Sequence, residues 1–315
     1  MTIREALNEG SAALAAAGIE NSGLDASLLL AETLNINRSS LIAAIEPVTE
    51  AQFADFRNLI QRRLAGECTA YILGRKEFFG LEFLVNPSTL VPRPDTETLV
   101  EAALEEVGSR EWGVGSGGSK RERLAITNPS LCVLDLCTGC GAIAIALKHT
   151  MPELEVWATD ISAEALEVAQ ANAARLLPPD AIHFCCGDLF EAYSEMPRRL
   201  DYKQQPPISD PHSPLPIILS NPPYIPSAEI AGLTPEVRRE PILALDGGDD
   251  GLVIIRRIIS GAPQLLCPGG VLLLEADPRQ MKPIAALLSQ AGFTGIQTRR
   301  DLSGSERVIS GILEI

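Results

Sequence analysis

From about residue 131 onward, short apolar runs alternate regularly with segments of helical periodicity, a pattern that few folds accept. The apolar runs span residues 131–136, 155–160, 182–188, 216–220 and 271–276, and two closing strands are expected near 296–300 and 307–313. Repeated units of this kind predict an α/β fold in which helices cover both faces of a parallel sheet. Ligands of such sheets bind outside the carboxyl ends of the strands, so the residues that follow each strand are the candidates for a site.

The first of these strands ends in a glycine loop, within the stretch LDLCTGCGAIAIAL. Asp135 closes the strand, and Gly139 and Gly141 let backbone N–H groups approach a ligand at the start of a helix. The spacing C-T-G-C-G lacks the G-x-G-x-x-G of dinucleotide-binding loops. It better matches the D-x-G-x-G-x-G loop of S-adenosylmethionine enzymes, with Cys137 in the position of the first glycine.

Acidic residues follow the next two strands. Asp160 ends the second strand, where a carboxylate can accept hydrogen bonds from a ribose diol. Asp188 follows the third strand, where S-adenosylmethionine enzymes contact the adenine. Either residue alone could be a helix cap, but three such features at the ends of three successive strands favour a cofactor site.

The fourth strand stops at about Ser220, because the stretch ILSNPPYIP continues with two prolines that cannot donate to a sheet. An amide or exocyclic amine nitrogen is a poor nucleophile, and acceptors aimed at its N–H groups orient its lone pair toward an incoming methyl group. The Asn221 side-chain oxygen and the Pro222 carbonyl are predicted to be these acceptors, with Tyr224 packing on the planar target group.

The rest of the chain is expected to fall into three parts. Residues 1–75 predict a helical bundle that docks a substrate, and residues 76–94 predict a β-hairpin around Gly80. Residues 95–315 form the catalytic part, in which Asp95 or Thr96 caps a helix running to about Val107. Two polar, Gly- or Pro-rich stretches at about 108–130 and 196–216 are interpreted as surface insertions.

The charge balance bears on the class of partner. The net charge of −15 argues against stable binding to nucleic acid, which normally requires a basic surface. The first ten residues do not resemble a signal peptide, and no apolar run approaches the length of about 20 residues that spans a bilayer. We therefore expect a cytoplasmic protein without a membrane contact.

The spacing of Cys137 and Cys140 is that of a C-x-x-C motif, which can be a redox pair or half of a metal site. No second C-x-x-C or C-x-x-H follows to complete a zinc site, and the glycine loop already accounts for both positions. We therefore predict no metal.

Taken together, the motifs resemble the HemK/PrmC family, the N5-glutamine methyltransferases of peptide chain release factors. The resemblance runs over nearly the whole chain, through GLEFLVNPSTLVPRPDTETLV, LDLCTGCGAIAIAL, SNPPYIP, EPILALDGGDDGL, GGVLLLEAD and SGSERVISG. The stretch VPRPDTE is the most specific of these, because generic NPPY enzymes lack it in this position. The chain departs from the family pattern at Cys137, Cys140 and Leu189, and reads LEAD where relatives often read LEHG or LEIG.

The resemblance implies a Rossmann-like class I S-adenosylmethionine-dependent methyltransferase with a small N-terminal helical bundle and a connecting β-hairpin. The cofactor would be S-adenosylmethionine, contacted by Cys137, Thr138, Gly139, Cys140, Gly141, Asp160, Asp188, Leu189 and Asn221. The glutamine would be held by Asn221, Pro222, Pro223 and Tyr224, of which Asn221, Pro222 and Tyr224 would be catalytic. The partner would be a release factor methylated at the glutamine of its Gly-Gly-Gln motif and gripped by the helical bundle.

Three alternatives remain open at this point. An adenine N6-methyltransferase on DNA or RNA uses a similar Asn-Pro-Pro-Tyr sequence, although the chain lacks a recognisable target-recognition domain. A glutamine methyltransferase acting on a ribosomal protein would share almost every motif. A non-catalytic protein that only senses the cofactor would have lost Asn221 or the glycine loop, and both are present.

Overall fold

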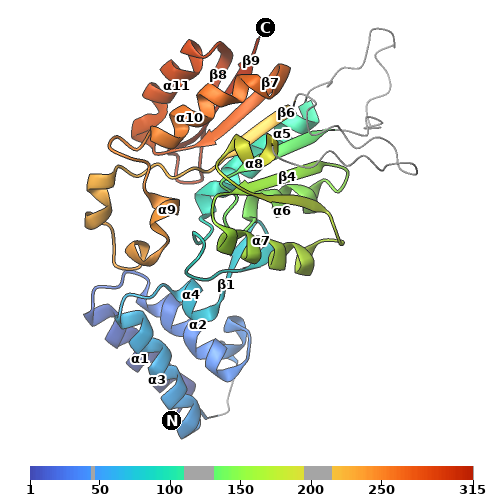
Figure 1. Cartoon of the computed structure of the whole chain (residues 1–315). Coiled ribbons are helices and arrows are strands. Elements are labelled where there is room, and N and C mark those ends of the chain that lie inside the picture. Colours follow the sequence, from blue (N-terminus) through green and yellow to red (C-terminus); the bar gives the residue numbers. More distant parts are fainter. Residues whose placement is uncertain (44–46, 110–130, 195–214, 315) are drawn as a thin grey trace.

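The structure is a computed structural model that describes residues 1–43, 47–109, 131–194 and 215–314. Most of the two expected insertions, 108–130 and 196–216, lies outside the described residues. Figure 1 shows a group of helices at the N-terminus beside a larger part built on a twisted sheet. In the described ranges, every helix is too short or too polar to cross a membrane.

The N-terminal helices pack around an apolar core of their own. They are α1 (Ile3–Ala16), α2 (Ser22–Leu34), the 3-10 helix η1 (Arg38–Ile42), α3 (Glu50–Leu64) and α4 (Thr69–Leu73). Capping boxes at Thr2 and Thr49 begin α1 and α3, because each threonine satisfies a backbone N–H that the first helical turn leaves unpaired. Leu14, Leu30 and Phe56 fill the centre of this core. The predicted helical bundle is confirmed.

A two-stranded antiparallel hairpin follows the bundle, as predicted. It consists of β1 (Arg75–Phe78) and β2 (Leu81–Leu84), and Gly80 adopts a positive φ of 74° in its turn. The next element differs from the expectation that Asp95 or Thr96 caps a helix. A 3-10 turn, η2 (Pro94–Thr96), leads directly into α5 (Glu97–Ser109). The two side chains instead pair with distant residues that are described below.

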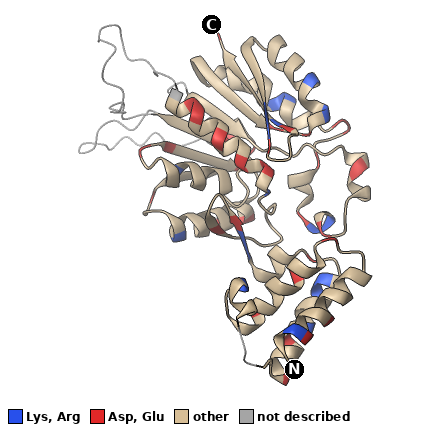
Figure 2. Ribbon diagram, turned by 180° about the vertical axis from the view of Figure 1, so that it is seen from behind, with Lys and Arg blue, Asp and Glu red and all other residues tan. Residues whose placement is uncertain are grey.

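Acidic side chains gather along α5, at Glu97, Glu101, Glu105 and Glu106, and Figure 2 shows charged residues of both signs over the rest of that face. Arg299 makes an ion pair with Glu105 at 2.5 Å, which ties α5 to the last strands of the sheet.

The large sheet has seven strands in the order β5-β4-β3-β6-β7-β9-β8. The strands are β3 (Cys132–Leu136), β4 (Glu155–Asp160), β5 (Ile182–Cys186), β6 (Leu215–Ser220), β7 (Leu266–Glu275), β8 (Phe293–Arg300) and β9 (Glu306–Leu313). The first five are parallel, whereas β9 is antiparallel to both β7 and β8. The strand order reverses at β3, so the switch point lies between the carboxyl ends of β3 and β6.

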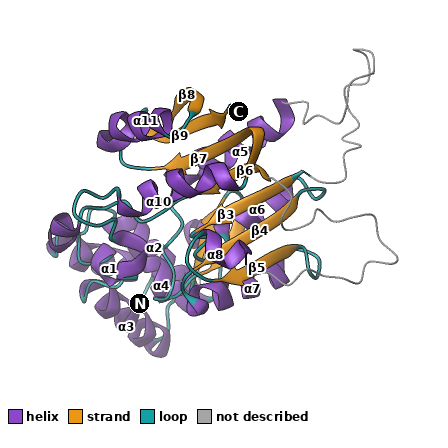
Figure 3. Ribbon diagram, turned by 45° about the horizontal axis from the view of Figure 1, so that its top comes forward, coloured by secondary structure: helices purple, strands orange, loops and turns teal. Residues whose placement is uncertain are grey.

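Helices cover both faces of this sheet (Figure 3). The remaining helices are α6 (Ala142–Thr150), α7 (Ala163–Leu176), α8 (Phe190–Ser194), η3 (Ser227–Gly232), η4 (Val237–Arg239), α9 (Ile242–Leu245), α10 (Val253–Gly261), η5 (Ala262–Gln264), η6 (Pro278–Gln280) and α11 (Met281–Gln290). Val133 packs with α5, α6 and α7 on one face, whereas Leu134 packs with α10 and α11 on the other. This alternation follows from the two-residue period of a strand, and it confirms the predicted α/β class.

A segment that follows β6 connects the sheet to the helical bundle. In α3 the buried Arg63 pairs with Asp25 at 2.7 Å and with Glu236, in that segment, at 2.5 Å. Nearby, Arg239 donates to the Ala65 carbonyl at 2.5 Å. These contacts hold the bundle against the part of the chain that continues into the wall of the candidate site.

Candidate active site

A cavity of about 410 Å³ opens at the carboxyl ends of β3, β4, β5 and β6, at the switch point of the sheet. Nine of the twelve predicted site residues line it: Cys137, Thr138, Gly139, Cys140, Asp160, Asp188, Leu189, Asn221 and Pro223. The other three, Gly141, Pro222 and Tyr224, do not line this cavity as the described residues form it. The volume lies in the range of small-molecule sites, about 300–1,000 Å³.

Glycine is required at two positions of the loop after β3. Gly139 has a φ of 58°, and a Cβ built there meets nothing within 4 Å, so the backbone is open toward the cavity. Gly141 has a φ of 81°, and a Cβ there would lie 3.1 Å from the Ala169 Cβ of α7. Gly141 therefore acts through close helix packing rather than by lining the cavity. Cys137 adopts a φ of 59°, a conformation that favours glycine, which is the residue the family pattern has there.

Asp160 holds the loop in place. Its Oδ2 accepts from the Gly139 N–H at 2.8 Å and its Oδ1 accepts from the Ser162 N–H at 2.9 Å. Burial raises the pKa of Asp160, while these backbone hydrogen bonds act in the opposite direction. Each carboxylate oxygen has a second lone pair, so Asp160 can hold the loop and still accept from a ligand hydroxyl.

Asp188 faces a cation that the sequence interpretation missed. Arg257, on α10, also lines the cavity, and its Nη2 donates to Asp188 Oδ2 at 2.8 Å. The pair engages one carboxylate oxygen of Asp188 and keeps an arginine at the edge of the site. Leu189, next in the chain, is buried with a φ of 49°.

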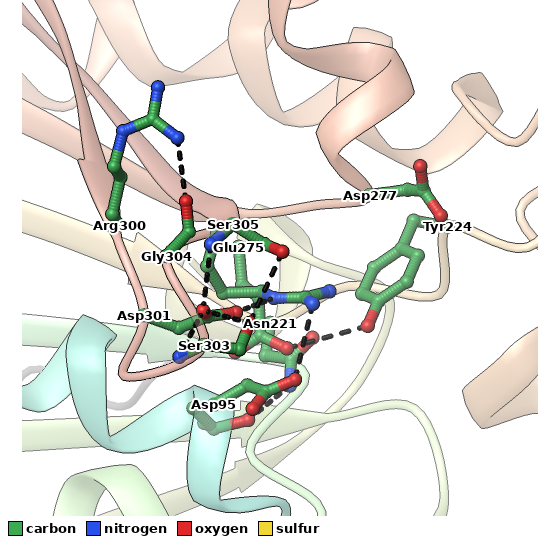
Figure 4. Close-up of polar contacts among 12 residues, drawn as sticks. Asp95, Asn221, Tyr224, Glu275, Asp277, Arg300, Asp301, Ser303, Gly304 and Ser305 are labelled. Atoms are coloured by element: carbon green, nitrogen blue, oxygen red, sulfur yellow. Dashed lines mark hydrogen bonds and ion pairs between the residues drawn. The ribbon is translucent and has the colours of Figure 1, made fainter.

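The Asn-Pro-Pro-Tyr segment begins where β6 ends, as predicted. The Ser220 hydroxyl donates to the Leu136 carbonyl at 2.8 Å and ties the ends of β6 and β3 together. Asn221 Nδ2 donates to Thr96 Oγ1 at 3.2 Å, and both residues line the cavity. The Tyr224 hydroxyl donates to Glu275 Oε1 at 3.4 Å (Figure 4). The packing of Tyr224 on a target group therefore stays a prediction.

A loop and a short helix supply walls that the sequence did not indicate. The loop runs through Leu90 and Pro92, within GLEFLVNPSTLVPRPDTETLV, and the helix is α9, which begins with Ile242 and Leu243 within EPILALDGGDD. Ile242 and Leu243 are 53% and 65% exposed, so an apolar rim lies at the mouth of the cavity. The sequence signal for these residues was the resemblance of the two stretches to the family, because a loop and a single helical turn are too short to show a hydrophobic period.

The two loop cysteines are free thiols. Burial raises the pKa of both Cys137 and Cys140 to about 12, so their thiolate forms are suppressed near neutral pH. Among the described residues, no group of three or more His, Cys, Asp or Glu side chains is arranged to hold a metal ion.

Comparison with known proteins decides the family. A family model described as PrmC N-terminal domain matches residues 5–74, and one described as methyltransferase domain matches residues 133–202. The release factor glutamine methyltransferase of Moorella thermoacetica is 37% identical over 309 residues, which cover 98% of this chain and 97% of that protein. That of Bradyrhizobium diazoefficiens is 39% identical over 312 residues, with 98% and 94% covered. The chain belongs to the release factor glutamine methyltransferase family.

Family membership confirms the resemblance that the motifs indicated and the methyltransferase class. A solved structure supports the fold alone: the hMettl16 catalytic domain in complex with MAT2A 3'UTR hairpin 6 has a TM-score of 0.52 and 16% identity, and 82% of each chain is covered.

Proposed function

We propose that this member of the release factor glutamine methyltransferase family transfers a methyl group from S-adenosylmethionine to N5, the side-chain amide nitrogen, of the glutamine in a release factor's Gly-Gly-Gln motif. One observation carries the proposal: Asn221 lines the same cavity as the glycine loop and Asp160. A residue suited to orient an amide acceptor and a loop suited to a nucleoside cofactor thus open onto one space. The family's shared name supports the choice of acceptor.

The described residues fit S-adenosylmethionine. The open backbone of Gly139, the spare lone pairs of Asp160 and the acid Asp188 at the next strand end provide the contacts that the cofactor needs. When bound, S-adenosylmethionine supplies an electrophilic methyl group. Cys137, Thr138, Cys140 and Leu189 would form the rest of its walls.

The amide nitrogen of glutamine needs activation because its lone pair is delocalised. Acceptors placed at its N–H groups favour the geometry and the positive charge of the transition state. In this proposal the Asn221 side-chain oxygen is one acceptor and the Pro222 carbonyl is the other, and Pro223 forms part of the wall beside them. The prolines restrict the backbone, so these acceptors need little reorganisation when the glutamine enters.

Docking of the protein substrate is assigned to the helical part. We propose that residues 1–75 form a docking domain, that residues 76–94 link it to the methyltransferase domain of residues 95–315, and that the release factor spans the two. The exposed Ile242 and Leu243 at the mouth of the cavity would receive the apolar parts of the substrate loop. Remote contacts of this kind position a flexible glutamine for reaction. Because a release factor acts in translation, we propose that the activity is cytoplasmic.

A nucleic-acid substrate is less well supported. The net charge of −15 offers little to offset the cost of a few kcal/mol for extracting a base from a duplex. The glutamates along α5 would add repulsion toward a phosphate backbone (Figure 2).

The test compares candidate acceptors in parallel methyl-transfer reactions. Purified protein receives S-adenosylmethionine with a labelled methyl group and, in parallel, an intact release factor, the same factor with the motif glutamine replaced by alanine, ribosomal proteins, and duplex or single-stranded DNA. Label in the intact factor and none in its glutamine variant is the expected result. Label in the ribosomal proteins or in DNA, with the release factor unlabelled, would transfer the proposal to one of the two rival acceptors.

A further inference from the structure

Behind the cavity, Thr96 lies between Asn221 and the buried carboxyl group of Glu275. Asn221 Nδ2 donates to Thr96 Oγ1 at 3.2 Å. Thr96 is itself buried, and its hydroxyl faces Glu275, at the end of β7, where it lowers the pKa of that carboxyl group. Tyr224, the last residue of the Asn-Pro-Pro-Tyr segment, contacts Glu275 directly, because its hydroxyl donates to Glu275 Oε1 at 3.4 Å (Figure 4). Glu275 therefore supports both ends of the segment, one directly and one through Thr96.

The arrangement of Asn221, Thr96 and Glu275 determines which way the Asn221 amide points. A threonine hydroxyl has a single proton. If Thr96 gives that proton to the Glu275 carboxylate, its oxygen can only accept from Asn221, so the Asn221 partner must be its NH₂ group. The Asn221 oxygen is then on the opposite side of the amide, free of Thr96. An amide turned by 180° would bring two acceptors together and would present a donor to the glutamine.

We propose that Thr96 and Glu275 are positioning residues that hold the Asn221 amide with its oxygen available to the glutamine N–H. The inference rests on the proposed function, which it deepens by naming what orients the acceptor. It also accounts for Thr96, which the sequence suggested as a helix cap and which the structure instead directs toward Asn221.

The protonation state of Glu275 determines whether the Asn221 amide is held in a single orientation. Glu275 is 1% exposed, and its Oε2 has no hydrogen-bond partner among the described residues. Burial raises the pKa of Glu275 to about 7, with Thr96, Arg307 and Tyr224 lowering it and Asp95 raising it. The positive charge of Arg307 is shared, because Arg307 pairs with Asp95 at 3.1 Å and with Asp301 at 3.2 Å.

Only the ionised carboxylate requires Thr96 to donate. Once protonated, the Glu275 carboxyl group can itself donate, so Thr96 no longer has to donate to it and both orientations of the Asn221 amide become available. The orientation suited to catalysis is thus enforced above a pH of about 7 and relaxed below it.

The first experiment compares Thr96→Val, which removes the hydroxyl at nearly constant shape, with Thr96→Ser, which restores it. We expect Thr96→Val to lower kcat at least tenfold while KM for the release factor and Kd for S-adenosylmethionine stay within threefold. Thr96→Ser should recover kcat to within threefold of wild type. The matched control is Thr98→Val, a buried threonine two residues away on α5 that does not line the cavity, and it should leave kcat within threefold. Wild-type kcat in Thr96→Val, or an equal loss in Thr96→Ser, would overturn the assignment of Thr96.

The second experiment follows pH in Glu275→Gln. The wild-type kcat should rise as pH increases through about 7, and this rise should be absent in the variant. Asp135, buried at the base of the glycine loop, also has a pKa raised to about 7 by burial. A rise that survives in Glu275→Gln therefore belongs to another group such as Asp135 and would overturn the role of Glu275.

A third measurement needs no substrate, so it separates this inference from the proposed function. The folded pKa of Glu275 is raised, so the folded state binds the extra proton and wild-type stability falls as pH increases from about 4.5 to about 7. Glu275→Gln lacks this loss, so its unfolding temperature relative to wild type should increase between pH 5 and pH 8. If the difference in unfolding temperature between Glu275→Gln and wild type is the same at pH 5 and pH 8, the account of Glu275 is overturned. If the wild-type protein methylates another acceptor instead of a release factor, the proposed function fails, and the Thr96 comparison is run on the acceptor that is labelled.

Discussion

Replacing Asp160 tests the cofactor site most sharply, because the structure shows what each of its oxygens already does. One oxygen accepts from the Gly139 N–H and the other from the Ser162 N–H. Asp160→Asn keeps one acceptor oxygen and places an NH₂ group where the other was, so one of the two backbone donors loses its partner. Asp160→Ala removes both acceptors.

The expected magnitude follows from these contacts. A hydrogen bond from a ribose hydroxyl to a carboxylate contributes about 1.5–3 kcal/mol, which corresponds to a factor of about 10 to 150 in affinity. Isothermal titration of Asp160→Ala with S-adenosylmethionine should therefore show a Kd at least about tenfold higher than that of wild type. Burial raises the pKa of Asp160, so wild-type affinity should also decline as pH falls through that raised value, a decline that Asp160→Asn should lack.

A neighbouring acid serves as the control. Glu164 lies in the first turn of α7, is exposed, and bonds the Ser162 hydroxyl at 3.1 Å without lining the cavity. Glu164→Gln removes the same charge nearby and should leave Kd within twofold. Unchanged affinity in Asp160→Ala would refute the assignment of the ribose to Asp160. An equal loss in Glu164→Gln would mean that general charge, rather than a direct contact, is responsible.

Three further substitutions test the hydrogen-bond acceptor Asn221, the buried ion pairs of Arg63 in the helical bundle, and the apolar rim of the cavity at Leu243. Asn221→Ala should lower kcat by at least about a hundredfold in the methyl-transfer assay with cofactor Kd within threefold, and a near-normal kcat would make the segment merely structural. Arg63→Met should lower the free energy of unfolding in urea by about 3–5 kcal/mol, because it leaves Asp25 buried without its cation. Adding Asp25→Asn to this variant should recover part of the loss, and no recovery would contradict the pairing. Leu243→Asp should raise KM for the release factor at least tenfold with cofactor Kd within threefold. Leu302→Asp, at a site that is 99% exposed and does not line the cavity, should change neither. A raised cofactor Kd in Leu243→Asp would place Leu243 beside the cofactor instead.

The elements of the sheet were predictable because their signals are local. A buried strand shows as a continuous apolar run, and proline ends a strand by lacking a donor, so β6 stops at Ser220 as expected. The glycine loop and Asp160 follow from the same reasoning, since the carboxyl ends of parallel strands meet at one edge.

The parts of the site that sequence did not indicate depend on contacts between distant segments. Thr96 and Asn221 are 125 positions apart, and Asp188 and Arg257 are 69 apart, so no periodic pattern connects either pair. The direction of Tyr224 was unpredictable for the same reason. Its hydroxyl contacts the Glu275 carboxyl group at the end of β7, which lies near Tyr224 only once the sheet has assembled.

Localising the transferred methyl group tests the central claim most directly. Release factor incubated with the protein and S-adenosylmethionine is digested, and tandem mass spectrometry of the peptide that contains Gly-Gly-Gln identifies the methylated atom. The account predicts one methyl group on the side-chain amide nitrogen of that glutamine, and its loss with Asn221→Ala. A methyl group on any other residue of the factor, or an unmodified peptide while DNA or a ribosomal protein is labelled in parallel, would contradict it.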